Sequence, residues 1–256
     1  MVYSELHGII SIMASKVILT TGANRGIGFS IVQALAQRSS DLTLLVASRS
    51  KDNASEAVSQ LQGLGLKADF QPIELDVTSD DSIKSAIKEV KAKYGKLDVL
   101  INNAGIAGKI AEDNSDFRDT YQKIMNTNVT SVALVSTLFL PLLREAKDPR
   151  VVNVSSARGS LTLVTTGKNP PTAFTAYSVS KAALNLLTVE MSHANTDVEF
   201  QAVNPGWCKT GFNGFRGPRD PLEGAQSAAE LALAPKGQYK AGFWAWENET
   251  MEEVPW

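Results

Sequence analysis

The sequence predicts a single domain of the α/β class, built on a doubly wound parallel sheet that is flanked by helices. From Lys16 onward, short runs rich in β-branched residues alternate with longer stretches of helical periodicity, which is the pattern of crossover βαβ units. Most of the short runs are too apolar for a half-exposed sheet, so helices should cover both of its faces. No repeat or linker interrupts the alternation. We therefore expect one domain over residues 15–256, preceded by an N-terminal extension at 1–14.

Six short runs are expected to form successive strands, and a last strand is expected near Gly242–Trp246. In chain order the six are 17–21, 42–48, 68–75, 97–102, 150–155 and 198–203. Each is short enough for a strand and is followed by a segment with turn residues or helical spacing. The expected sheet is therefore parallel, with helices as its crossovers.

Four longer segments carry the helical pattern. They are 26–38, 79–94, Phe117–Leu143 and Ala176–His193. The second of them begins with Ser and Asp residues, which favour helix N-termini, and Gly95 should end it. Proline and glycine gather after Asn204, so we expect a looser segment at about 205–237, inserted before the last strand and close to the substrate.

Composition and charge argue against several classes of protein. The 256 residues are 43% hydrophobic, and 25 Lys and Arg stand against 27 Asp and Glu, giving a net charge of −2. This balance suits a globular protein with a sizeable core and offers no overall attraction to nucleic acid or to an anionic membrane. The first 14 residues lack a basic region and are shorter than the ~20 apolar residues that span a bilayer. We expect a surface extension there, with Met13 as an alternative start, and no nucleic-acid or membrane partner.

One cysteine and two histidines limit the metal and redox chemistry. Cys208 cannot form a disulfide within the chain, which suits a reducing compartment and predicts a cytoplasmic protein. His7 and His193 lie far apart and belong to no ligand pattern, so no metal site is expected.

A glycine-rich turn joins the first expected strand to the first expected helix. The segment 21–28 reads TGANRGIG and contains Gly22, Gly26 and Gly28. Glycine accepts positive φ and close approach, and a helix start offers free N–H groups and a positive dipole end to a pyrophosphate. The spacing is not the G-x-G-x-x-G fingerprint, so this motif alone leaves open a dinucleotide site and an ordinary tight turn.

The end of the second expected strand bears on which dinucleotide would bind. An acidic residue there would hold the ribose 2′-hydroxyl of NAD, but the chain has Ser48 followed by Arg49. Arg25 lies inside the glycine turn, and guanidinium groups suit a 2′-phosphate through paired hydrogen bonds. The two arginines favour NADPH, unless both are merely solvated surface charges.

Three polar residues form a candidate proton-transfer group. Tyr177 and Lys181 are four residues apart in a helical stretch, so their side chains share one face. A free tyrosine titrates near ~10, and an adjacent positive charge would favour its ionised form. Ser156 follows a buried-looking strand, where its hydroxyl could polarise a carbonyl oxygen. Taken alone, the Tyr and Lys spacing is also common on ordinary helix surfaces.

Taken together, five motifs in order resemble those of the short-chain dehydrogenase/reductase family, in details most closely its carbonyl reductase branch. They are TGANRGIG at 21–28, NNAG at 102–105, NVSS at 153–156, YSVSK at 177–181 and NPGWCKT at 204–210. The resemblance covers essentially all of 15–256. It implies a Rossmann-type fold, an NADP(H) cofactor and a small-molecule carbonyl substrate.

The resemblance also assigns catalytic roles. Tyr177 would be the general acid, and Lys181 would hold the nicotinamide ribose and lower the pKa of Tyr177. Ser156 would steady the substrate carbonyl. Asn128 would complete a water-linked proton relay, with Asn126 as a nearby competitor for that role.

The cofactor would lie along the carboxyl ends of the strands. The resemblance places Asp76 and Val77 against the adenine and 205–210 against the nicotinamide carboxamide. Cys208 would occupy a backbone-binding position, so a small apolar role is favoured over a reactive thiol. The residues expected to contact the cofactor are Gly22, Asn24, Arg25, Gly26, Ile27, Gly28, Ser48, Arg49, Asp76, Val77, Asn103, Ala104, Gly105, Tyr177, Lys181, Pro205, Gly206, Cys208 and Thr210.

The leading functional hypothesis is an NADPH-dependent reductase of small or medium ketones, aldehydes or quinones. A narrow-specificity biosynthetic ketoreductase or alcohol dehydrogenase is an alternative, because one set of catalytic residues serves many substrates. A non-catalytic NADPH sensor is a third hypothesis, against which the intact Tyr177 and Lys181 argue. In many relatives the helices matching 117–143 and 176–193 form a homo-oligomer, a dimer or tetramer, but the long interval between Ser156 and Tyr177 leaves a monomer open.

Overall fold

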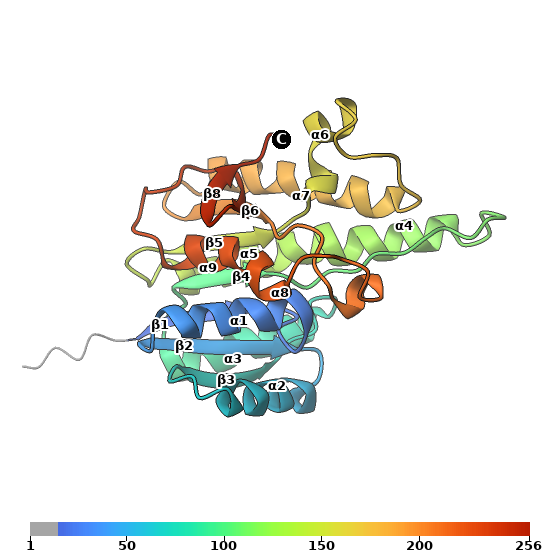
Figure 1. Ribbon diagram of the computed structural model, residues 1–256. Helices are drawn as coiled ribbons and strands as arrows, with labels where there is room; N and C mark the ends of the chain where they lie inside the picture. The colour runs from blue at the N-terminus through green and yellow to red at the C-terminus, as the bar shows by residue number, and fades with distance from the viewer. Residues whose placement is uncertain (1–14) are drawn as a thin grey trace, which may run out of the picture.

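Eight strands form one sheet in the computed structural model, which describes residues 15–256 (Figure 1). The strand order is β3-β2-β1-β4-β5-β6-β7-β8, and every neighbouring pair is parallel except β7 with β8. The strands are β1 Lys16–Thr20, β2 Leu42–Ser48, β3 Asp69–Glu74, β4 Val99–Asn102, β5 Arg150–Val154, β6 Glu199–Asn204, β7 Phe243–Glu247 and β8 Thr250–Glu253. The predicted α/β class with a doubly wound parallel sheet is confirmed, and the predicted extension at 1–14 lies outside the described residues.

The seven parallel strands match the predicted runs to within two residues at each end, but the eighth strand was not predicted. Strand β8 is polar, lies at the sheet edge and pairs with β7 in the antiparallel direction. The turn between them consists of Asn248 and Glu249, which have φ values of 50° and 62°. Two-residue hairpins need positive φ at both positions and usually contain glycine, so this turn has a weak sequence signal.

Helices cover both faces of the sheet. Their bounds are α1 Gly26–Arg38, α2 Lys51–Gly63, α3 Asp80–Tyr94, α4 Phe117–Met125, α5 Ser131–Leu143, α6 Leu161–Thr165, α7 Thr175–Ala194, α8 Pro221–Gly224 and α9 Gln226–Leu233. Apolar residues of α1, α2 and α9 pack on one face of the sheet, and those of α3, α5 and α7 pack on the other. Side chains alternate along each strand, so Ile18 of β1 joins the first core and Leu19 joins the second.

Local sequence explains where these helices start and stop. In α3 the Ser79 hydroxyl accepts a hydrogen bond from the backbone N–H of Ser82, and Asp80 and Asp81 occupy the positive first turn. Gly95 ends the helix in the left-handed conformation with φ of 70°. The predicted stop at Gly95 is confirmed.

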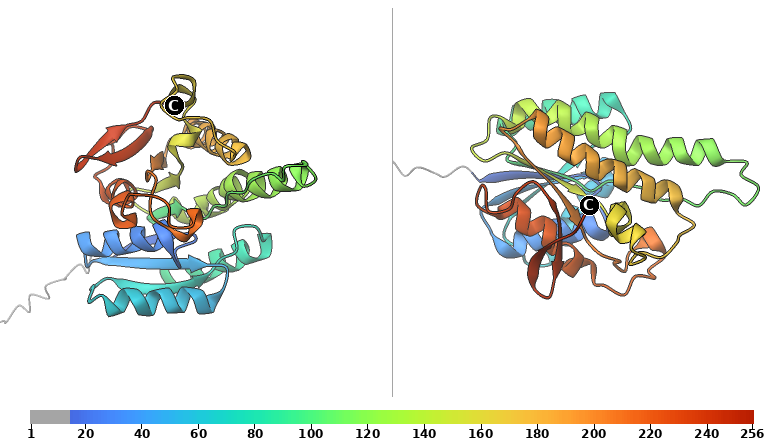
Figure 2. Two further views of the ribbon diagram at one scale, coloured as in Figure 1. Left: turned by 45° about the vertical axis from the view of Figure 1, so that its right-hand side comes forward. Right: turned by 90° about the horizontal axis from the view of Figure 1, so that it is seen from above.

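The predicted helix over Phe117–Leu143 is not one regular α-helix. A π-helical turn, Asn126–Thr130 (η1), separates α4 from α5. Such a turn inserts an extra residue into the helix and often marks a functional site. Hydrophobic spacing alone could not reveal it, because the apolar pattern continues on both sides. Figure 2 shows α4 and α5 running alongside α7, and the three elements pack on one another through η1.

By length and composition Phe117–Leu143 is also long and apolar enough to cross a membrane, but half of its most apolar stretch is buried inside the molecule. Val135 and Phe139 of α5 belong to the core beneath the sheet. Core helices of soluble proteins pass the same test, so this feature is weak evidence for a membrane span.

The expectation of a looser segment over 205–237 is wrong for its second half. Helix α9 lies in this range, and Ala228, Ala229 and Leu231 are almost completely buried against the sheet. Proline and glycine near 217–224 dominated the sequence pattern, whereas the small alanines that let α9 approach the sheet closely gave a weak helical signal. The first half does form loops and short turns.

Candidate active site

The predicted site residues lie at the carboxyl ends of the parallel strands, around the point where the strand order reverses between β1 and β4. Open α/β sheets bind their ligands in the crevice at such a switch point. Ser156 follows β5, Asn103 follows β4 and Pro205 follows β6. The fold therefore brings together three of the motifs that are separated in the sequence.

The glycine turn after β1 is held in a defined shape by the segment after β4. Asn103 Nδ2 donates hydrogen bonds to the carbonyl oxygens of Thr21 (2.8 Å) and Gly22 (3.1 Å). Thr21 Oγ1 accepts hydrogen bonds from the backbone N–H groups of Asn103 and Ala104, each at 3.0 Å. Gly22 has φ of 61°, and a Cβ there would lie 3.1 Å from Ala104 Cα. The two motifs thus form one rigid unit.

This unit leaves the start of α1 free to bind an anion. The first turn of α1 has no acidic residue, and the Arg25 side chain makes no capping hydrogen bond. Gly26 has φ of 57°, and a Cβ there would lie 3.6 Å from the Thr210 side chain, so the glycine turn faces the loop after β6. Free N–H groups at a helix start and a close approach without a side chain are what a dinucleotide pyrophosphate requires. These residues fit a nicotinamide dinucleotide.

The residues predicted at the adenine end lie at the ends of β2 and β3. Ser48 is buried, whereas Arg49 and Arg25 are exposed. Asp76 Oδ1 accepts hydrogen bonds from the backbone N–H (2.9 Å) and the hydroxyl (2.7 Å) of Thr78, so part of its carboxylate is used within the turn. Val77 is buried beside it.

The catalytic candidates converge around the first turns of α7. Lys181 Nζ lies 5.7 Å from the centre of the Tyr177 ring and donates a 2.8 Å hydrogen bond to the Val154 carbonyl. The Ser156 hydroxyl lies near the Tyr177 phenol and lowers its pKa. A Cβ on Gly105 would lie 3.8 Å from Lys181 Nζ, so glycine there keeps the space beside the ammonium open.

Asn128, on the π-helical turn, is completely buried, whereas its competitor Asn126 is exposed. The Asn128 side chain donates to the Ile106 carbonyl and accepts from the Ile106 backbone N–H, both at 2.8 Å. Its Nδ2 also lies 3.0 Å from Ser180 Oγ, which donates to the Tyr177 carbonyl at 2.7 Å. Asn128 therefore ties the segment after β4 to α7. These contacts favour Asn128 over Asn126 for the predicted role.

A buried polar group holds the end of β5 against α7. Ser155 Oγ lies 2.5 Å from Asn185 Oδ1, and Asn185 Nδ2 donates to the Gly159 carbonyl at 3.2 Å. A Cβ on Gly159 would lie 2.6 Å from the Lys181 carbonyl carbon, so the 3₁₀ turn Ala157–Gly159 (η2) packs directly on α7. This contact fixes Ser156 relative to Tyr177.

Burial shifts the pKa of Tyr177 and the pKa of Lys181 in the directions that favour their uncharged forms. It raises the pKa of Tyr177, while the Ser156 hydroxyl and the positive charge of Arg158 act in the opposite direction. Burial lowers the pKa of Lys181 to about 8. In this arrangement Lys181 Nζ donates to the Val154 carbonyl and burial dominates the pKa of Tyr177, so the lowering of that pKa by Lys181 stays a prediction.

Three residues near the site were not among the predicted ones. Asn204 Oδ1 accepts hydrogen bonds from the N–H groups of Ala157 (3.0 Å) and Gly206 (3.1 Å), linking the Ser156 turn to the loop after β6. The Phe212 ring lies 5.8 Å from the Tyr177 ring. Arg158 follows Ser156 by two positions. Asn204 could have been found as the first residue of the NPG motif, and Phe212 lies in the segment 205–237 that was expected close to the substrate, whereas Arg158 carries no sequence signal.

The sequence and the fold both match known proteins. Residues 16–220 match the family model described as short chain dehydrogenase. A short-chain dehydrogenase/reductase of Aspergillus fumigatus is 35% identical over 262 residues, covering 95% of this chain and 98% of that protein. Carbonyl reductase (NADPH) 1 of Bos taurus is 32% identical over 258 residues, covering 86% and 91%.

Among solved structures, the NADPH-bound carbonyl reductase from chicken fatty liver superposes with a TM-score of 0.79. It is 27% identical, and the match covers 95% of this chain and 100% of that one. The family model matches most of the strands of the sheet, and the predicted motifs lie together at one edge of it. This chain therefore belongs to the short-chain dehydrogenase/reductase family of oxidoreductases.

Proposed function

We propose that this protein reduces the carbonyl group of apolar ketones, aldehydes or quinones with NADPH, and that Tyr177 is the proton donor. The observation that carries the proposal is the convergence of Tyr177, Ser156 and Lys181 at the open end of a dinucleotide cradle. A non-catalytic NADPH sensor would have no need of a phenol placed beside a serine hydroxyl and a lysine ammonium.

The proposed cofactor supplies a hydride to the carbonyl carbon when it is bound. The start of α1 and the glycine turn would hold its pyrophosphate, and the residues after β6 would hold its nicotinamide end. Lys181 would contact the nicotinamide ribose from beside Gly105. The buried ammonium, with its pKa lowered to about 8, is well placed to gain such a polar partner.

Within the proposed site, Ser156 and Tyr177 would bind the substrate oxygen together. The Ser156 hydroxyl acts on the pKa of Tyr177 and so lies near the phenol, where both groups could reach one carbonyl oxygen. The raised pKa keeps Tyr177 protonated at neutral pH, which is the form that a reductase needs for its acid. The Tyr177 proton would move to the oxygen as hydride arrives at the carbon.

Arginines and aromatic residues support the preferences for cofactor and substrate. Arg25 and Arg49 are exposed at the edge of the site, where a 2′-phosphate would lie, and the bovine and chicken relatives carry NADPH in their names. Phe212 lies beside Tyr177, and Trp207 and Phe215 on the same loop are 62% and 64% exposed. Exposed aromatic side chains at the mouth of a site favour an apolar substrate.

Steady-state oxidation of NADPH and of NADH, measured with a panel of ketones, aldehydes and quinones, tests the proposal. We expect turnover that prefers NADPH by tenfold or more. Tyr177→Phe should retain NADPH binding and lose about 10²–10⁴-fold in kcat, because it removes only the proton donor. A variant that keeps most of its kcat, or a tenfold preference for NADH, contradicts the corresponding part of the proposal.

A further inference from the structure

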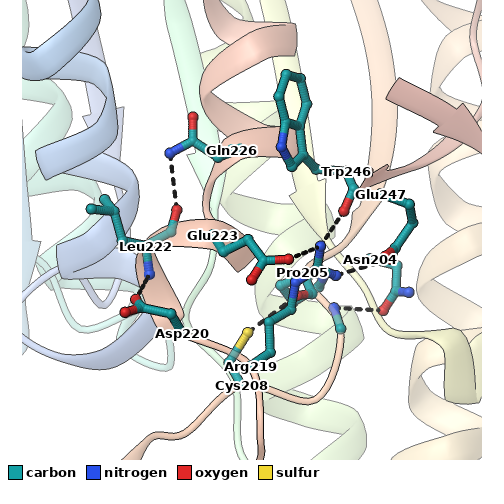
Figure 3. A network of polar contacts seen from close by, with 11 residues as sticks. Asn204, Pro205, Cys208, Arg219, Asp220, Leu222, Glu223, Gln226, Trp246 and Glu247 are labelled. Carbon is teal, nitrogen blue, oxygen red and sulfur yellow. Dashed lines mark hydrogen bonds and ion pairs between the residues drawn. The ribbon is translucent and has the colours of Figure 1, made fainter. Parts of the chain in front are cut away.

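Arg219 is a buried arginine behind the loop 205–210, outside all of the motifs described above. Its side chain is 11% exposed and is surrounded on three sides by acceptors (Figure 3). Nη1 lies 2.9 Å from Glu247 Oε1, and Nη2 lies 2.8 Å from Glu223 Oε1. Nη2 also donates to the backbone carbonyl of Trp246. One guanidinium thus connects the end of β7 with α8.

The same residue is bound to the loop through its backbone. The Lys209 N–H donates to the Arg219 carbonyl at 2.8 Å, and the Arg219 N–H donates to the Trp207 carbonyl at 3.2 Å. Cys208 lies between these two hydrogen bonds and forms an isolated β-bridge with Arg219. The backbone of 207–209 therefore has Arg219 as its pairing partner.

The guanidinium also fills the space against the turn at Gly206. This glycine has φ of 78°, and a Cβ there would lie 2.7 Å from Arg219 Nη1. On the other side, a Cβ on Gly224 would lie 2.3 Å from Cys208 Sγ, which is 3.1 Å from the Pro205 carbonyl oxygen. Figure 3 shows Arg219 and Cys208 next to each other, with both side chains directed toward Pro205. The loop is held by packing as well as by hydrogen bonds.

We infer that Arg219 is a positioning residue that fixes the nicotinamide end of the cofactor site through the loop 205–210. This inference rests on the proposed function, in which that loop contacts the nicotinamide. Replacing Arg219 would leave Glu223 and Glu247 without their shared cation, remove two donors and open space behind Gly206. The adenine end would be unaffected, because Arg25, Arg49 and Asp76 lie in the turns that follow β1, β2 and β3.

Equilibrium binding of two ligands separates this role from a general loss of stability. NADPH reaches both ends of the site, whereas 2′,5′-ADP reaches only the adenine end. For Arg219→Met we expect NADPH binding to weaken tenfold or more and 2′,5′-ADP binding to stay within twofold of the unsubstituted protein. Arg144→Met is the matched control, because Arg144 forms an exposed ion pair with Asp197 at 2.7 Å away from this loop. It should change neither affinity.

Two further variants keep the test decisive if Arg219→Met does not fold. Glu247→Gln and Glu223→Gln each remove one charge partner and should each weaken NADPH binding by a smaller factor, again without changing 2′,5′-ADP binding. Arg219→Lys retains the charge and should restore part of the NADPH affinity. Amide hydrogen exchange at Lys209, measured without cofactor, should become faster in Arg219→Met because its acceptor is no longer held in place.

The outcomes distinguish this inference from the proposed function. If Arg219→Met binds NADPH as tightly as the unsubstituted protein, or loses affinity for both ligands by the same factor, Arg219 does not position the nicotinamide end. If the unsubstituted protein binds neither NADPH nor NADH, the proposed function fails and the inference fails with it.

Discussion

Burial acts in opposite directions on the pKa of Tyr177 and of Lys181, and both changes favour the uncharged side chain. Tyr177 stays a neutral phenol with its pKa above the usual value, and the pKa of Lys181 falls to about 8. Among the described residues, the Val154 carbonyl accepts the hydrogen bond that Lys181 Nζ donates. The site therefore holds a desolvated cation that a bound ribose could stabilise.

Burying the charged Lys181 side chain lowers the free energy of unfolding. We therefore predict that Lys181→Met changes this free energy by an amount that depends on pH. Because the folded-state pKa is about 8 against 10.5 for the exposed group, the unfolded chain binds more protons between these values, and stability rises with pH across that window. Below pH 8 Lys181 is charged in both the folded and the unfolded chain, so the full free-energy cost of burying its charge applies. Without cofactor, Lys181→Met should be more stable than the unsubstituted protein by roughly 1–2 kcal/mol at pH 7, after allowing for one lost hydrogen bond.

Urea unfolding at pH 7 and pH 10 measures this difference. The gain from Lys181→Met should shrink toward zero at pH 10, where Lys181 is largely neutral in the folded protein. A gain of equal size at both pH values would show that packing, and not charge burial, stabilises the variant.

Arg158 is predicted to influence the proton donor through its charge. Its positive charge lowers the pKa of Tyr177 against the larger effect of burial, so Arg158→Leu should raise that pKa further. Since reduction uses the protonated phenol, the loss of activity at alkaline pH should move to higher pH in this variant. The pH profile of kcat for ketone reduction checks the shift, with Arg144→Leu as a distant arginine control. A shift to lower pH, or the same shift in the control, contradicts the charge effect.

At the scale of elements, the π-helical turn Asn126–Thr130 determines which asparagine faces the site. The extra residue in the turn points Asn128 inward, where it is fully buried, and leaves Asn126 exposed. Asn128 then satisfies both backbone polar groups of Ile106 and contacts Ser180. A regular α-helix through this segment would place its residues differently against α7.

Asn128 and Asn126 allow a matched comparison, because both lie in the π-helical turn and only Asn128 is buried. Asn128→Ala should destabilise the protein by about 1–3 kcal/mol, because the N–H and carbonyl of Ile106 lose their partner inside the protein. It should also lower kcat by loosening α7 around Tyr177. Asn126→Ala, at an exposed position, should stay within about 0.5 kcal/mol. Denaturant unfolding and kcat measured on both variants check this, and equal effects would mean that the turn does not select Asn128.

At the scale of the whole molecule, much of the fold could be predicted because the sheet is buried on both faces. Runs such as 42–48 are mostly apolar and prove to be buried along their whole length, which locates strands well. The antiparallel β8 could not be predicted, because it is polar and depends on pairing with β7. Helix α9 was not predicted, because the prolines and glycines before it indicated a loop, although its alanines belong to the core.

The same reasoning explains which parts of the candidate site could be predicted. Tyr177 and Lys181 could be predicted from their spacing on one helix, and Ser156 from its position after a buried strand. The fold brings all three together at one edge of the sheet. Arg219 has no such pattern. Its partners come from α8 and from the end of β7, so only the assembled molecule brings them together. Oligomeric state stays a prediction, with exposed Val179 and Leu186 on α7 as the surface to examine.

In the proposed reaction, hydride passes from NADPH to a carbonyl carbon while Tyr177 supplies the proton. Mass spectrometry of the alcohol formed from an apolar ketone and NADPH carrying deuterium on the transferred position of the nicotinamide tests it most directly. We predict one deuterium at the carbinol carbon, and no product above background with Tyr177→Phe. Product without deuterium, or labelled product formed at the normal rate by Tyr177→Phe, would contradict the account.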